Sequence, residues 1–214
     1  TLRHLSVKSC NLTQLPDNLP LRLTYLACTG NRLTALPALP NTLEYLDCSY
    51  NPQARLPDLS DALLHLACLG IYNLTALPAL PAGLRFLDCG SNWLGSLPPL
   101  PVALEDLECS SNVLTTLPAP LPPNLKYLRC SANIIRRLPE VPRTLERLEC
   151  NGARGRHEGA ARTARHGHHE TRLLRQWTAD DPEAARDSSA DGVLWKCLDV
   201  TTGATRSART LEVR

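Results

Sequence analysis

The chain has 214 residues, a formal net charge of +2 and only 4% aromatic residues, which excludes a core packed mainly on rings. Residues 1–152 hold 12 basic and 12 acidic side chains, and this balance argues against a nucleic-acid-binding groove. No stretch approaches the ~18 apolar residues of a membrane-spanning helix. The chain contains no Met, so we expect it to be a fragment or a processed piece.

A hexad, Leu-x-x-Leu-x-Cys or its Val variant, occurs eight times at steps of 20 or 21 residues. Its opening leucines are Leu2, Leu23, Leu43, Leu63, Leu84, Leu104, Leu125 and Leu145. Apolar residues alternate with others inside each hexad, as in a short strand with one buried face. An asparagine recurs five residues after the second leucine in most units, at Asn31, Asn51, Asn92, Asn112 and Asn133. This pattern is typical of leucine-rich repeats, and it predicts that residues 1–152 form about eight of them.

The second half of each unit is rich in Leu-Pro pairs, and 17 of the 18 prolines lie before residue 143. Proline removes a backbone donor and disfavours helix in the residue before it, so this side should be extended or polyproline-like. The predicted fold is an α/β-type leucine-rich-repeat solenoid, with a curved parallel sheet and an extended convex side. In the fourth unit Ile71 replaces the asparagine and one residue is extra, which predicts a local distortion at residues 70–73.

Seven of the nine cysteines share the last position of the hexad, at Cys28, Cys48, Cys68, Cys89, Cys109, Cys130 and Cys150. Side chains at this position project side by side from parallel strands, which does not suit disulfide geometry. We therefore expect a buried column of reduced thiols that act as small core residues. A straight column is also not the tetrahedron that zinc requires, and we expect neither a metal nor a cofactor.

Two columns of strand residues should face solvent on the concave side. The first contains four of the six Tyr and Phe residues of the chain, and the second is rich in carboxylates beside them. The predicted protein-binding surface consists of Tyr25, Tyr45, His65, Phe86, Tyr127, Asp47, Asp88, Asp106 and Glu108. Rings beside charges are typical of interfaces, although the rings could instead cover neighbouring strands as cross-strand pairs do.

The repeats stop after Gly152 and the composition changes. Residues 153–169 are rich in Arg and His, which predicts a solvated basic linker. The cluster of His166, His168 and His169 could alternatively bind a metal. Residues 170–214 are predicted to form a short tail, partly disordered or helical.

The Asn-x-Leu-Thr-x-Leu-Pro-x-Leu-Pro type of block recurs at residues 31–40, 92–101 and, with one insertion, 112–122. These blocks resemble the short repeats of bacterial type III secreted effectors of the YopM, IpaH and SspH type. The resemblance implies secretion from a bacterium into the cytoplasm of a host cell, and a host protein as the partner on the concave face.

The ligase branch of these effectors carries a catalytic Cys-x-Asp motif after the repeats. The sequence Cys197-Leu198-Asp199, with Trp177 upstream, is similar to it. The resemblance implies Cys197 as a thioester nucleophile, Asp199 as the carboxylate beside it, and a ubiquitin-conjugating enzyme as a further partner. Two functions follow: a non-catalytic binding scaffold, or the substrate-recognition part of an E3 ubiquitin ligase. Only 15 residues follow Asp199, which favours the scaffold.

Overall fold

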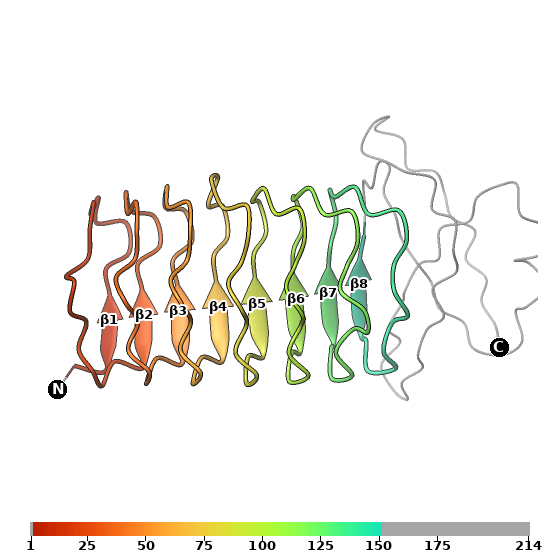
Figure 1. Cartoon of the computed structure of the whole chain (residues 1–214), viewed down its shortest axis with the longest axis horizontal. Coiled ribbons are helices and arrows are strands. Elements are labelled where there is room, and N and C mark those ends of the chain that lie inside the picture. Colours follow the sequence, from red (N-terminus) through yellow and green to blue (C-terminus); the bar gives the residue numbers. More distant parts are fainter. Residues whose placement is uncertain (1, 151–214) are drawn as a thin grey trace, which may run out of the picture.

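The computed structural model describes residues 2–150, which form one parallel sheet of eight strands in chain order. The strands are β1 (His4–Ser6), β2 (Tyr25–Ala27), β3 (Tyr45–Asp47), β4 (His65–Ala67), β5 (Phe86–Asp88), β6 (Asp106–Glu108), β7 (Tyr127–Arg129) and β8 (Arg147–Glu149). Figure 1 shows them side by side, one from each repeat, with the return segments between them. The predicted leucine-rich-repeat solenoid is confirmed.

The central leucine of each strand pairs in register with the central leucine of the next one. From Leu26 in β2 to Leu128 in β7 these side chains are fully buried, and they form the middle of the core. Within residues 2–150 the return segments contain neither helix nor strand, as the frequent prolines predict. The chain can therefore close each turn in about 20 residues, because no helix has to be accommodated on the convex side.

The recurring asparagines join successive repeats through their side-chain amides. Asn51 Nδ2 donates hydrogen bonds to the carbonyl oxygens of Cys28 and Cys48, at 3.0 and 3.1 Å. Its Oδ1 accepts a hydrogen bond from Leu33 N in the preceding repeat, at 3.0 Å. The same arrangement recurs at Asn31, Asn92, Asn112 and Asn133. This ladder satisfies backbone groups that would otherwise be buried without partners where each strand ends.

The ladder is interrupted in the fourth repeat, where Ile71 occupies the position of the asparagine. Ile71 is fully buried, and its backbone N donates to Asn92 Oδ1 at 2.8 Å. Its side chain cannot donate to Cys48 O, which within residues 2–150 accepts a side-chain hydrogen bond from Asn51 only. The extra residue lengthens the loop after β4, which reaches beyond its neighbours in Figure 1. The distortion expected at residues 70–73 is therefore a longer loop, together with the loss of the asparagine side-chain hydrogen bonds at this position.

The cysteine column lies in the core beside the leucines. Cys28, Cys48, Cys68, Cys89 and Cys109 are buried free thiols, Cys130 is also buried, and Cys150 is half-buried. Burial, followed by the nearby carboxylate of Asp47, raises the pKa of Cys28 to about 12. Burial also raises the pKa of Cys89 well above its ordinary value. The thiols are therefore uncharged at neutral pH and pack as small apolar groups, as expected.

Candidate protein-binding surface

The sheet places two columns of side chains on its solvent-facing side, here called the concave face. In the first column Tyr45 pairs with His65, and His65 pairs with Phe86. In the second column Asp47, Ala67 and Asp88 follow one another on the same three strands. The alternation along each strand buries the leucine between the two columns, so both columns are held on a rigid surface.

The rings of the first column form a continuous stack. His4 and Tyr25 lie 3.9 Å apart between ring centroids, Tyr25 and Tyr45 4.2 Å, Tyr45 and His65 4.3 Å, and His65 and Phe86 4.0 Å. The planes of each pair differ by 13° or less. The faces of the inner rings are thus occupied by one another, and their edges remain available to a partner. The rings both cover their neighbours and form a half-buried ridge.

The stack ends at Phe86 because the next strand carries Asp106 instead of a ring. Tyr127, one strand further, therefore lies outside the stack. Its hydroxyl donates a hydrogen bond to Glu146 at 2.9 Å. The structure places Tyr127 in the predicted column, although its ring does not join the stack. Its part in a binding surface stays a prediction.

The carboxylates of the second column differ in their partners. Arg129 donates to Glu108 at 2.6 Å and to Asp106 at 2.9 Å. Lys8 lies 3.6 Å from Asp47, which is a looser ion pair. Asp88 accepts a hydrogen bond from Gly90 N at 3.1 Å, but it forms no ion pair with any residue in the part of the chain that the structure describes. Asp47, Asp88 and Glu108 are here called the acidic row. Within residues 2–150 this row has a cation near each end, Lys8 and Arg129, and no ion pair at Asp88 in its centre.

Burial changes the ionisation of several groups on this face. It raises the pKa of Asp88, and the neighbouring Glu108 raises it further, whereas Gly90 N and Arg129 lower it. It lowers the pKa of His65, with Asp47 opposing the change, so His65 is a neutral ring at pH 7. Burial and then the neighbouring Tyr25 raise the pKa of Tyr45 to about 12. His65 and Tyr45 are consequently uncharged at neutral pH, beside carboxylates that are incompletely neutralised.

Three exposed rings were not predicted as a group. Tyr50, Tyr72 and Trp93 lie in the loops after β3, β4 and β5, and each is more than half exposed. The ring of Tyr50 lies over Gly70, where an added Cβ would come within 2.7 Å of it. In the sequence each of these rings stands next to the position of the recurring asparagine. Tyr50 precedes Asn51, Tyr72 follows Ile71, and Trp93 follows Asn92. These rings border the concave face at the edge where the strands end.

A buried amide was also missed. Gln53 occupies the position that Leu33, Leu94 and Leu114 fill in other repeats, and it is fully buried. Neither Gln53 Oε1 nor Nε2 has a hydrogen-bond partner within residues 2–150. The amide lies near Cys48, where it favours the thiolate, but burial is the larger effect and raises the pKa of that thiol. The signal was the break in the Asn-x-Leu pattern at this position.

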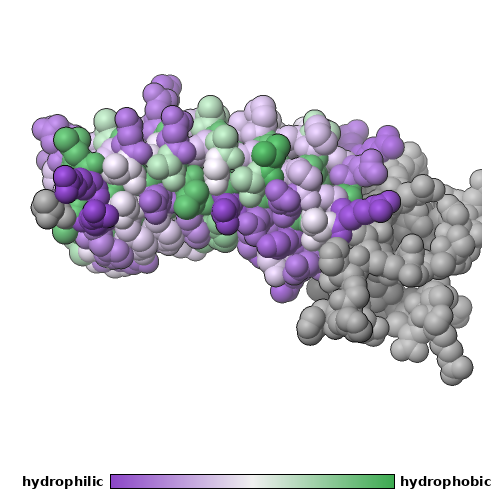
Figure 2. All heavy atoms as spheres, turned by 90° about the horizontal axis from the view of Figure 1, so that it is seen from below, coloured by the Kyte–Doolittle hydropathy of each residue, from purple (hydrophilic) through white to green (hydrophobic). Residues whose placement is uncertain are grey.

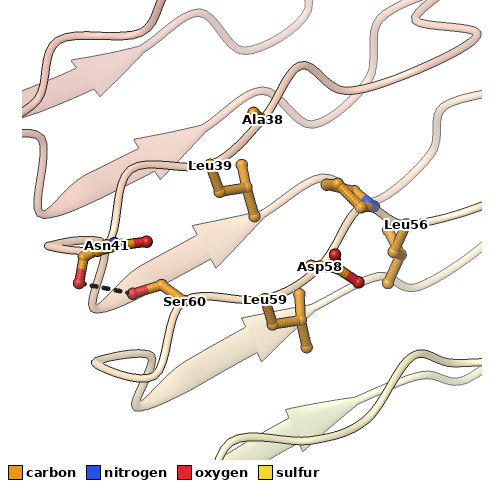
Figure 3. A pocket seen from close by; sticks show the side chains of 8 residues that line it. Ala38, Leu39, Asn41, Leu56, Asp58, Leu59 and Ser60 are labelled. Atoms are coloured by element: carbon orange, nitrogen blue, oxygen red, sulfur yellow. Dashed lines mark hydrogen bonds between the residues drawn. The ribbon is translucent and has the colours of Figure 1, made fainter.

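Other surfaces offer weaker candidates. Figure 3 shows an open depression on the convex side, lined by Leu39 and Leu59 from adjacent return segments. Beside it, Ser60 Oγ donates a hydrogen bond to Asn41 O at 2.9 Å. Figure 2 shows the edge where the chain enters the strands, with apolar side chains scattered among polar ones. Among residues 2–150 no group of three or more metal-binding side chains is present, and no helix is long and apolar enough to cross a membrane.

The predicted catalytic pair, Cys197 and Asp199, lies outside the described residues, as do the basic segment 153–169 and the tail 170–214. Their roles stay predictions from the sequence.

No family model matches the chain, and no curated protein matches it. Among solved structures it is similar to YopM from Yersinia enterocolitica, with 32% identity and a TM-score of 0.56, over 76% of this chain and 42% of that one. It is similar to the functional domain of InlJ from Listeria monocytogenes, which includes a cysteine ladder, with 28% identity and a TM-score of 0.57, over 70% of this chain and 34% of that one. A Shigella effector leucine-rich-repeat domain is 34% identical, with a TM-score of 0.45, over 65% of this chain and 54% of that domain. The chain thus spans less than half the length of the YopM and InlJ structures.

Proposed function

We propose that this chain, whose repeats are bacterial leucine-rich repeats of the effector type, is a protein-binding module that holds its partner on the concave face. The observation that carries the proposal is the half-exposed stack from His4 to Phe86 beside an acidic row. Rings held rigidly lose little conformational entropy on binding, and aromatic side chains are frequent anchors of interfaces. A solenoid presents such a surface over a long, shallow face that suits a protein better than a small ligand.

The proposal extends to the kind of partner. Similarity to YopM supports a secreted effector that acts in the cytoplasm of a host cell, where the partner is a host protein. A reducing cytosol also suits the many free thiols of the chain.

Photo-crosslinking can test which face binds. Tyr45 in the stack and Tyr72 at the neighbouring edge are both tyrosines, so each can be replaced by the same photoreactive phenylalanine derivative. After irradiation in host-cell lysate we expect discrete adducts from position 45 and none above background from position 72. Adducts from position 72 alone would contradict the assignment of the concave face. Thermal unfolding of both variants checks that the repeats remain intact.

A second candidate function rests on the sequence motif Cys197-Leu198-Asp199. In this alternative the concave face selects a substrate for an E3 ubiquitin ligase, and Cys197 accepts ubiquitin as a thioester. Incubation of the chain with a charged ubiquitin-conjugating enzyme separates the two functions. A scaffold gives no adduct, whereas a reducible adduct that is absent in Cys197→Ala would establish the ligase.

A further inference from the structure

In the second column of the concave face, an alanine lies between two acidic residues on three neighbouring strands. Asp47 on β3, Ala67 on β4 and Asp88 on β5 are in register, so the two carboxylates flank the small side chain of Ala67. Adjacent strands lie about 4.8 Å apart, which separates the two acidic backbones by about 10 Å. This distance leaves room above Ala67 for one cationic side chain within reach of both carboxylates.

The same column shows how the chain itself fills such a position. Arg129 on β7 is in register with Glu108 on β6 and Glu149 on β8, which is an acid, Arg and acid sequence. Its guanidinium donates to Glu108 at 2.6 Å and reaches Asp106 at 2.9 Å. Around Ala67 the corresponding position holds no cation from the described residues, and the first column carries Tyr45 and Phe86 on the flanking strands instead of an acid such as Asp106.

Among residues 2–150 no cation forms an ion pair with Asp88. Lys8 reaches only Asp47, at 3.6 Å, and Arg129 is bound to Glu108 and Asp106. Burial raises the pKa of Asp88, although Gly90 N and Arg129, which forms no ion pair with Asp88, lower it. The half-buried rings of His65 and Phe86 stand beside this position on the same strands, and their edges offer apolar contact to the methylene groups of a long side chain.

We propose that the concave face binds a protein segment through a Lys or Arg side chain that lies over Ala67 and forms an ion pair with Asp88, with its aliphatic part against His65 and Phe86. This inference rests on the proposed function and specifies the chemistry of the partner. The acidic row is complementary to a basic segment, and arginine fits best because its planar guanidinium can contact two carboxylates at once. The rings add contact area, but their stacked faces leave little room for a cation on them.

Fluorescently labelled peptides of about ten residues can test the charge requirement on the full chain. One peptide alternates arginine with threonine, a second alternates lysine with threonine, and a third alternates glutamate with threonine. We expect binding of the two basic peptides, with arginine tighter, and no binding of the acidic one. Equal binding of basic and acidic peptides, or no binding of either basic peptide, would overturn the proposal.

Two substitutions locate the binding position. Asp88→Asn should weaken the arginine peptide about tenfold, whereas Asp58→Asn, which removes the same charge on the convex side, should leave the affinity within about twofold. Ala67→Arg should place a cation beside Asp47 and Asp88, in the way that Arg129 lies beside Glu108 on the adjacent strand. It should raise the thermal midpoint of unfolding and abolish binding. Equal losses in Asp88→Asn and Asp58→Asn would show general charge attraction only and reject the proposal.

The outcome is distinguishable from failure of the proposed function. If position 45 crosslinks to a partner segment without Lys or Arg, the concave face binds protein but the cation is not required. If position 45 gives no adducts, both proposals fail. A synthetic peptide of residues 153–169 serves as a further probe, since it contains four arginines. Tighter binding of this peptide through Asp88 would make the occupant the chain itself and overturn the assignment to a separate partner.

Discussion

His65 and Phe86 stack with ring centroids 4.0 Å apart and planes that differ by 2°. The other face of His65 lies against Tyr45, at 4.3 Å between centroids. The imidazole is therefore enclosed between two rings, and burial lowers its pKa despite the nearby Asp47. The stack favours a neutral His65, which links the stability of the concave face to pH.

Acidification should weaken the repeats through His65. The unfolded chain binds this proton near the ordinary histidine pKa of about 6.5, whereas the folded chain binds it only at lower pH. The contribution of neutral His65 to stability is therefore complete above the unfolded pKa. It is lost as the pH falls from there through the lower pKa of the folded chain. His65→Phe keeps a ring in the stack without the titration. We expect the thermal midpoint of wild type to fall more than that of His65→Phe between pH 7 and pH 5. Parallel falls would show that His65 does not contribute.

Gln53 is a polar defect in the core, and its removal should stabilise the protein. Gln53→Leu replaces an unpartnered amide with the residue that other repeats carry there. We expect the free energy of unfolding to rise by about 1–3 kcal/mol, which is the ordinary cost of a buried polar group without a partner. Asn51→Leu, two residues earlier, is the matched control, since it removes an amide that is fully bonded, and it should be destabilising. Denaturant unfolding measures both. Destabilisation by Gln53→Leu would mean that the amide has a partner in solution.

The thiols should differ greatly in their reactivity. Cys10 is exposed, whereas Cys28 to Cys130 of the column are buried and their burial disfavours the reactive thiolate. Within residues 2–150 we therefore expect a thiol reagent to modify Cys10 first. The column should react slowly, or only after denaturant is added. Mass spectrometry of peptides after timed labelling gives the order. Rapid modification of Cys89 in the folded chain would contradict the core position of the column.

The repeat period determined most of the fold in advance, because the leucines recur at one structural position in every turn, and the asparagines and cysteines do so in most turns. The same periodicity placed Tyr25, Tyr45, His65 and Phe86 in one column. It did not show that their rings stack, nor that Arg129 neutralises Asp106 and Glu108, because side-chain conformations and long charge contacts depend on neighbours across strands. The sequence left two roles open for these rings, which were to cover neighbouring strands or to face a partner. The two roles are compatible, because stacked rings cover one another with their faces and leave their edges accessible.

Because the rings pack on one another, Tyr45 and Tyr127 should differ in their effect on stability. Tyr45 has a stacked ring on each side, and each such contact is worth about 0.5–1.5 kcal/mol beyond the buried area. Tyr45→Leu should therefore lower the free energy of unfolding by about 1–3 kcal/mol. Tyr127→Leu should lower it less, because that residue loses a hydrogen bond to Glu146 and no stacked partner. Denaturant unfolding of the two variants measures the difference. Equal losses would mean that stacking adds nothing to stability, and the rings would then matter only for a partner. A larger loss at Tyr45 requires that binding defects of stack variants be compared at a temperature where each variant is fully folded.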